Sequence, residues 1–207
     1  MVFYIILQFI VLMIAITMHE FAHGWVAYRL GDPTAKQMGR LTLNPIAHID
    51  PIGTIILPLL FFIFRLPPIG WARPVPVNFM RLNNPKRDML WVGISGPAAN
   101  LAIACVSILL LKILPVLSLT IIGQIMLLAA IINVVLCVFN LLPIPPLDGS
   151  RIVSSILPFR YVAVYDRLQP YGFLLIMLVI WSGMLRRVFY GIILLIVRFL
   201  DMPVSLF

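Results

Sequence analysis

The sequence VFYIILQFIVLMIAITM (residues 2–18) runs directly into His19-Glu20-Phe21-Ala22-His23. The apolar stretch carries no charge, no basic leading region and no small-residue cleavage site, so it does not resemble a signal peptide that is removed. It predicts a membrane helix that continues to about Leu30 and ends at Gly31-Asp32-Pro33. The chain therefore places a His-Glu-x-x-His motif near one end of a membrane helix.

The composition of the whole chain supports a membrane protein. Of 207 residues, 62% are hydrophobic and 11% are charged, against roughly 25% charged residues in an average soluble domain. The mean hydropathy is +1.10. Too few polar side chains remain to cover a soluble globule, and a disordered chain is excluded for the same reason. Cys105 and Cys137 both lie in apolar runs and indicate neither a disulfide framework nor a CxxC metal site.

Further apolar runs define the expected fold class. They cover residues 52–64, 89–114, 119–142, 171–185 and 188–200. We expect an all-α polytopic membrane protein: a bundle of about five transmembrane helices with a re-entrant segment and a small extended hairpin near the His-Glu-x-x-His motif. The chain is interpreted as one transmembrane domain, 1–207, with a core at about 1–160 that holds this motif. The C-terminal part, about 170–200, is expected to form a helical hairpin or one span followed by an interfacial helix.

The basic residues choose between two topologies. If every run spans the membrane and the N-terminus is outside, the basic loop after residue 64 also lies outside, against the positive-inside tendency. If the short run 52–64 enters the membrane and returns, segments 29–88 and 143–168 are both cytoplasmic and hold eleven of the fifteen Lys and Arg residues. These are Arg29, Lys36, Arg40, Arg65, Arg73, Arg81, Lys86, Arg87, Arg151, Arg160 and Arg167. The second topology implies a polar cavity that opens to the cytoplasm.

The His-Glu-x-x-His motif has the spacing of a zinc site. His19 and His23 lie four residues apart on one helix face, and Glu20, the only glutamate in the chain, is rotated by about 100° from His19. Two histidines can bind zinc, which lowers the pKa of a bound water to about 7, while Glu20 acts as general base. The alternative is a pair of histidines that only form hydrogen bonds, but a charged residue in a membrane helix is usually functional.

A catalytic zinc usually takes a third protein ligand. The metzincin pattern is excluded because Arg29 stands where its third histidine is required. The remaining donors are His48, Asp32, Asp50, Asp88, Asp148, Asp166 and Asp201. His48 is favoured by its chemistry, because imidazole is the commonest ligand. Asp148 is favoured by its position, because it follows a spanning run on the side where the first helix ends. One zinc ion per chain is expected.

Three motifs resemble those of the site-2 protease family of intramembrane zinc metalloproteases, peptidase family M50. They are HEFAH at residues 19–23, SGPAAN at residues 95–100 and NLLPIPPLDG at residues 140–149. The resemblance covers about residues 5–160. It implies zinc ligands at His19, His23 and Asp148, a catalytic base at Glu20, and a role for Asn140 in holding the substrate or the oxyanion. The PDZ and CBS domains of the family have no counterpart here, so the chain resembles a minimal form whose regulation is open.

Three further polar residues each have two interpretations. Asn100 either contacts the substrate or oxyanion, or caps backbone groups freed where Gly96-Pro97 kinks the helix. His48 either lines the cavity and supports a ligand, or has a structural role. Asn133 is expected to join helices through its side-chain amide.

These features predict an intramembrane zinc metalloprotease that hydrolyses transmembrane substrates in regulated intramembrane proteolysis. The expected partners are a transmembrane protein substrate and the lipid bilayer, not nucleic acid; a homo-oligomer is left open. The expected location is a prokaryotic cell membrane, with the active site open to the cytoplasm. An unwound substrate could lie along the re-entrant segment by strand addition. The alternatives are a metal-binding membrane transporter, which should show paired repeats, and an inactive protease-like scaffold.

Overall fold

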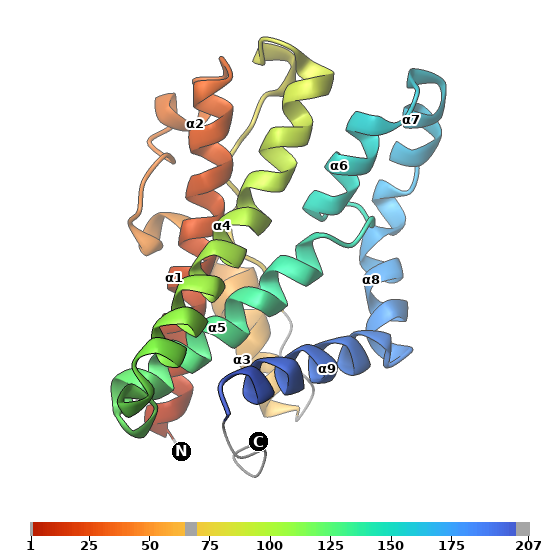
Figure 1. The fold of residues 1–207 in the computed structure, drawn as a ribbon. Coiled ribbons are helices and arrows are strands. Elements are labelled where there is room, and N and C mark those ends of the chain that lie inside the picture. The colour runs from red at the N-terminus through yellow and green to blue at the C-terminus, as the bar shows by residue number, and fades with distance from the viewer. Residues whose placement is uncertain (1, 65–69, 202–207) are drawn as a thin grey trace.

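The computed structural model describes residues 2–64 and 70–201, and it is built from helices (Figure 1). The α-helices are α1 (Val2–Arg29), α2 (Thr34–Gln37), α3 (Leu57–Ile63), α4 (Pro85–Ile113), α5 (Ile121–Asn140), α6 (Asp148–Ile156), α7 (Phe159–Asp166), α8 (Gly172–Trp181) and α9 (Met184–Phe199). A π-helix, Pro51–Ile56, leads directly into α3. The expectation of an all-α polytopic membrane protein is confirmed.

The expected extended hairpin near the active site is wrong for the described residues, which contain no β-strand. Residues 70–78 contain no helix, but no second strand lies beside them to form a β-ladder. Trp71 N donates to Gly53 O (3.1 Å), and Arg73 N donates to His48 O (2.9 Å). The bonds therefore join single residues of this segment to helical turns and not to a second strand.

Four stretches of the described chain are long and apolar enough to cross a membrane, where about five were expected. They are Phe3–Arg29, Pro85–Ile113, Ile121–Asn140 and Phe159–Trp181. The difference lies at the C-terminus. Gly183 adopts φ +72°, a left-handed conformation that glycine tolerates best, and the chain turns there. Figure 1 shows α9 running across the direction of α8, so the two helices form a bent pair and not the expected hairpin. The alternative, one span followed by an interfacial helix, stays a prediction.

Helices α1, α4 and α5 form the core of the bundle, with α4 also in contact with α6. Small side chains allow the helices to approach closely: Ala15, Ala27, Ala104 and Ala130 are buried at the contacts. The outward side chains include many exposed large apolar residues, which suit lipid contact. Pro97 lies inside α4, buried within the bundle.

The segment between α1 and α4 enters and returns on the same side. Helix α1 ends before Gly31, which has a left-handed φ of +106°. Just before α4, Asn83 N donates a hydrogen bond back to Leu30 O (2.9 Å). Asn78 N also donates to Asp32 Oδ2 (2.6 Å). The π-helix and α3 together cover 13 residues, six and seven, which is too few to cross. The return to the side where α1 ends therefore agrees with the expected re-entrant segment.

This chain path makes a labelling prediction. In a background without Cys105 and Cys137, Met80→Cys should react only with a reagent on the side where α1 ends, because Met80 is 83% exposed and lies between the re-entrant segment and α4. The positive-inside rule predicts that this side is the cytoplasm. Leu119→Cys is the matched control: it is 86% exposed in the turn between α4 and α5, at the opposite end of α4, and should react only from outside. Labelling of Met80→Cys from outside would contradict the orientation.

Candidate metal centre and active-site cavity

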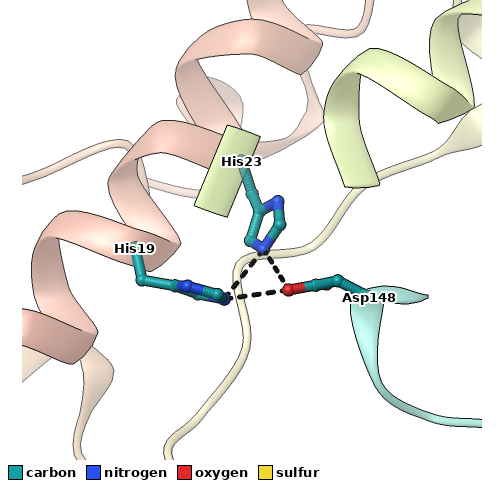
Figure 2. A group of neighbouring side chains, drawn as sticks. All are labelled: His19, His23 and Asp148. Atoms are coloured by element: carbon teal, nitrogen blue, oxygen red, sulfur yellow. Dashed lines mark hydrogen bonds and ion pairs between the residues drawn. The ribbon is translucent and has the colours of Figure 1, made fainter. Parts of the chain in front are cut away.

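Three side chains converge where α1 meets the start of α6. Figure 2 shows His19 and His23 of α1 and Asp148 of α6 pointing toward one another. The two Nε2 atoms are 3.0 Å apart, and Asp148 Oδ2 lies 3.0 Å from His19 Nε2 and 3.1 Å from His23 Nε2. Tetrahedral zinc with bonds of about 2.0–2.1 Å separates its ligand atoms by about 3.3 Å. The donor types and their spacing therefore fit one zinc ion, with a fourth position left for water or substrate.

Both imidazoles are oriented by their other ring nitrogen. His19 Nδ1 lies 2.6 Å from Asn100 Oδ1, and His23 Nδ1 lies 2.7 Å from the carbonyl oxygen of Val92. These partners are acceptors, so each Nδ1 carries the hydrogen and each Nε2 presents a lone pair to the centre. Such partners fix the ring orientation and the tautomer that a metal ion requires.

Asp148 is positioned by the first turn of α6. An acidic residue suits this turn because of the helix dipole. Gly149 permits the tight approach, since a Cβ atom there would lie 2.3 Å from the carbonyl oxygens of Leu141 and Leu142. Burial disfavours ionisation of Asp148. When both Nε2 atoms carry protons in place of a metal ion, the hydrogen bonds and charges of His19 and His23 outweigh burial and hold the pKa of the carboxyl well below its ordinary value.

Gly96 lets α4 pass directly beside the metal-binding rings. A Cβ atom at this position would lie 2.4 Å from His23 Nε2 and 2.7 Å from His19 Nε2. Real Cβ atoms do not approach other atoms so closely, and any side chain would displace the two ligand nitrogens. Close packing of α4 against the two imidazoles therefore explains why a glycine occupies this position of the SGPAAN motif.

Gly96→Ala is expected to lower zinc affinity by at least ~10-fold, the scale seen when groups that orient metal ligands are changed. The measurement is zinc competition with a chromogenic chelator on the purified protein. Gly93→Ala, one turn earlier in α4, is the control, because its Cβ would meet its nearest atoms at 3.2–3.4 Å. Equal zinc affinity in the two variants would contradict the steric argument.

Glu20 lies beside the metal ligands on the wall of a cavity of about 520 Å³. Its Oε2 accepts a hydrogen bond from Val75 N (2.7 Å), while Oε1 has no hydrogen-bond partner among the described residues. The cavity is also bounded by apolar side chains of α5 and α8. These are Leu136, Phe139, Phe173, Ile176, Met177 and Ile180. A carboxylate with one free oxygen, next to a zinc-type donor set, can exchange a proton with a water held there.

The two asparagines expected near the substrate have different surroundings. Asn140 lines the cavity, and its Nδ2 donates to Leu136 O (3.0 Å), which leaves the second N–H of the amide available. Asn100 is fully buried away from the cavity wall. Its Nδ2 donates to Asn133 Oδ1 (2.7 Å), and its Oδ1 faces His19. Asn100 therefore contacts a metal ligand, and Asn133 joins α5 to it.

His48 lies apart from the metal centre. It is fully buried, its Nε2 contacts Thr42 O (3.0 Å), and it belongs neither to the ligand group nor to the cavity wall. Its Nδ1 has no hydrogen-bond partner in the described part of the chain. Its carbonyl oxygen accepts from Arg73 N, so its backbone supports the segment that carries Val75.

Two contributors to the site did not emerge from the sequence. Arg151 lines the cavity with its Nη1 3.7 Å from Asp148 Oδ1 and its guanidinium 5.4 Å from the centre of the Phe79 ring. Its position three residues after Asp148 on a helix was the available signal. Val75 acts through its backbone N–H, which every residue except proline has, so no sequence signal pointed to it.

Comparison with known proteins identifies the family of the chain. The model of "Peptidase family M50" matches residues 116–182, which include Asp148. A Bacillus subtilis (strain 168) protein named "Putative zinc metalloprotease YwhC" is 41% identical over 172 residues, which cover 80% of this chain and 75% of the relative. The chain belongs to peptidase family M50, the site-2 protease family. It is thus a metalloprotease by family and a multi-pass membrane protein by its helices.

Two further relatives are also named as zinc metalloproteases. "Putative zinc metalloprotease Rip2" of Mycolicibacterium smegmatis is 28% identical over 184 residues, 87% of this chain and 69% of the relative. The protein of the same name from Mycobacterium tuberculosis H37Rv is 31% identical over 161 residues, 76% of this chain and 56% of the relative. No solved structure matches the chain.

Proposed function

We propose that this M50 protein is an intramembrane metalloprotease that binds one zinc ion per chain and hydrolyses peptide bonds of transmembrane proteins. The observation that carries the proposal is the triangle of His19, His23 and Asp148, which lies with Glu20 on the wall of a cavity between apolar helices. A protease that acts within the bilayer needs such a polar site enclosed by protein.

Different residues of the site bind the metal, transfer the proton and bind the substrate carbonyl. His19, His23 and Asp148 would hold zinc, which when bound acts as a Lewis acid and makes water more acidic. Glu20 takes the proton of the attacking water through its free Oε1 and returns it to the leaving amine. The free N–H of Asn140 Nδ2 would donate to the carbonyl oxygen of the scissile bond, where negative charge develops.

The extended segment 71–75 offers a place for an unwound substrate. Trp71 N and Arg73 N donate away from the cavity, to Gly53 O and His48 O. Ala72, between them, lines the cavity, and its N–H and C=O have no hydrogen-bond partner in residues 2–64 and 70–201. Neighbouring residues of an extended chain point their backbone groups to opposite edges, so the Ala72 edge can pair with a substrate by strand addition.

We infer that the site opens to the cytoplasm of a prokaryotic cell and acts in regulated intramembrane proteolysis. The inference is supported by the basic residues around α2, α4 and α6, which the positive-inside rule assigns to the cytoplasm, and by the bacterial relatives. Helix α1 carries its ligands near the end that meets this basic region.

The proposal is tested by metal analysis of the purified protein together with cleavage of a panel of single-span membrane proteins. We expect one zinc per chain, product termini inside the membrane span, loss of cleavage with a chelator and recovery with zinc. A metal transporter would move ions into vesicles without cleaving the panel, and a protease-like scaffold would bind zinc or substrate without turnover. Either result in place of cleavage would refute the protease assignment.

A further inference from the structure

Residues 71–75 form a strap across the cavity wall, and the strap is held from behind by a folded loop. Beyond the backbone bonds of Trp71 and Arg73, Thr54 Oγ1 donates to Trp71 O (2.8 Å). Trp71 packs on Gly53, where a Cβ atom would lie 2.4 Å from Trp71 Nε1. The start of the strap is therefore fixed to the π-helical turn that precedes α3.

The second half of the strap is held by a buried guanidinium. Arg40 is 8% exposed, and its Nη2 donates to the carbonyl oxygens of Arg73 (2.8 Å) and Pro74 (3.2 Å). Hydrogen bonds from a charged donor are stronger than neutral ones, and a charge is buried only where its contacts are specific. Among the described residues, no hydrogen bond or ion pair joins Arg40 to His19, His23 or Asp148. Its Nε has no hydrogen-bond partner there, and the hydrogen bonds of its side chain go to the strap.

The strap ends on the carboxylate that we assign as general base. Val75 N donates to Glu20 Oε2 at 2.7 Å, and Val75 is itself buried. Among the described residues, no other hydrogen bond involves the Glu20 carboxylate. A flexible glutamate side chain needs such support, since catalytic groups must be held within about 0.5 Å and 10–20° of the productive geometry.

We propose that Arg40 is a positioning residue for the reaction: it fixes the carbonyl groups of the strap, and the strap fixes the Glu20 carboxylate through the N–H of Val75. The inference rests on the proposed function, because it assigns Glu20 its role as base. It extends that function to a residue outside the His-Glu-x-x-His motif, twenty positions along the chain from Glu20. The metal ligands and the base are thus held by different parts of the chain. Helix α4 orients His19 and His23, and the strap orients Glu20.

The inference is tested with Arg40→Ala and Val75→Pro, the second of which removes the N–H itself. Val75→Ala keeps the N–H and gives the reference for Val75→Pro. Arg81→Ala is the control for loss of a cation, because the Arg81 side chain is exposed and its hydrogen bond in the described part of the chain goes to Gln37 Oε1 at 3.3 Å. We expect kcat to fall ~10–100-fold in Arg40→Ala, and in Val75→Pro relative to Val75→Ala, with zinc content unchanged, since a misplacement of about 1 Å costs about that much.

The double variant decides whether Arg40 acts through the strap. If both changes break one chain of contacts, Arg40→Ala with Val75→Pro should be no slower than the worse single variant. Multiplied effects would show that Arg40 acts by another route, and loss of zinc in Arg40→Ala would show that it supports the fold of the metal site. Either result overturns the inference. Thermal unfolding and metal content identify a variant that does not fold. In that case the comparison of Val75→Pro with Val75→Ala tests whether the strap positions Glu20.

A spectroscopic measurement separates support of the base from support of the metal ligands. The visible bands of the cobalt(II)-substituted protein report the groups that bind the metal, so Arg40→Ala and Val75→Pro should leave these bands unchanged. Changed bands in Arg40→Ala overturn the inference. In the Glu20→Gln background, where the base is absent, Arg40→Ala should lower the residual kcat no further, and a further fall also overturns the inference. A wild-type protein that cleaves no substrate refutes the proposed function instead, and the cobalt spectra still stand on their own.

Discussion

Glu20→Gln is expected to lower kcat by 10²–10⁴-fold while the protein keeps its zinc. General acid–base groups contribute about this much, equivalent to roughly 3–5 kcal/mol of transition-state stabilisation. Glutamine has nearly the same shape and can still accept the hydrogen bond from Val75 N, but it cannot take a proton from water. The measurement is single-turnover cleavage of a membrane-spanning substrate, with zinc content determined on the same sample.

The matched control for this variant is a change at a metal ligand. His19→Ala removes a ligand, so it should lose both zinc and activity, whereas Glu20→Gln should lose activity alone. Near-normal cleavage by Glu20→Gln at full zinc content would remove Glu20 from the role of base. Loss of zinc in Glu20→Gln would instead make it a supporting residue of the metal site.

Asp148→Ala is expected to bind zinc ~100-fold more weakly than the wild type, or not at all. Changes in residues that only orient metal ligands already cost 10–100-fold in affinity, and Asp148 Oδ2 lies within 3.1 Å of both histidine nitrogens. Its removal also leaves His19 and His23 as a pair, without the negative charge that balances a divalent cation in a membrane. Competition with a chelator of known affinity measures the loss.

His48→Ala distinguishes the two candidate third ligands. His48 is buried away from the ligand group and contacts Thr42 O, so this variant should keep most of its zinc affinity and lose thermal stability. Asp148→Asn, which keeps the shape of the side chain, separates the effect of charge from that of packing. Full zinc affinity in Asp148→Ala together with loss of zinc in folded His48→Ala would assign the third ligand to His48.

Much of the site was predictable from local spacing. His19 and His23 lie four residues apart on one helix, and helical geometry alone places them on one face. Asp148 was favoured over His48 by topology, since a chain that returns to the side where α1 ends brings the start of α6 to the same depth, and the family resemblance implied it. The structure places all three together. The membrane class and the end of α1 near Leu30 were likewise readable, because composition and a Gly-Asp-Pro signal determine them locally.

The predictions from the sequence were wrong where the direction of a segment had to be inferred in addition to its length. An apolar run shows that a segment suits lipid, but not whether the next run folds back beside it. The expected C-terminal hairpin became a bent pair at Gly183, whose left-handed φ sets the direction of α9. The expected extended hairpin failed because residues 70–78 bond to helical turns, and an isolated extended segment has the same local pattern as a paired strand.

The sequence by itself determined that this chain is a polytopic membrane protein with two zinc-type histidines and one glutamate on a single helix. Only the tertiary structure decided how those groups are held. His19 is oriented by Asn100, 81 positions away, His23 by a carbonyl 69 positions away, and Glu20 by an N–H 55 positions away. For His23 and Glu20 the physical reason is that backbone donors and acceptors exist at nearly every residue, so their use leaves no mark on the sequence. For Asn100 the residue was visible in the sequence, but the packing of α4 against α1 decided that its side chain meets His19.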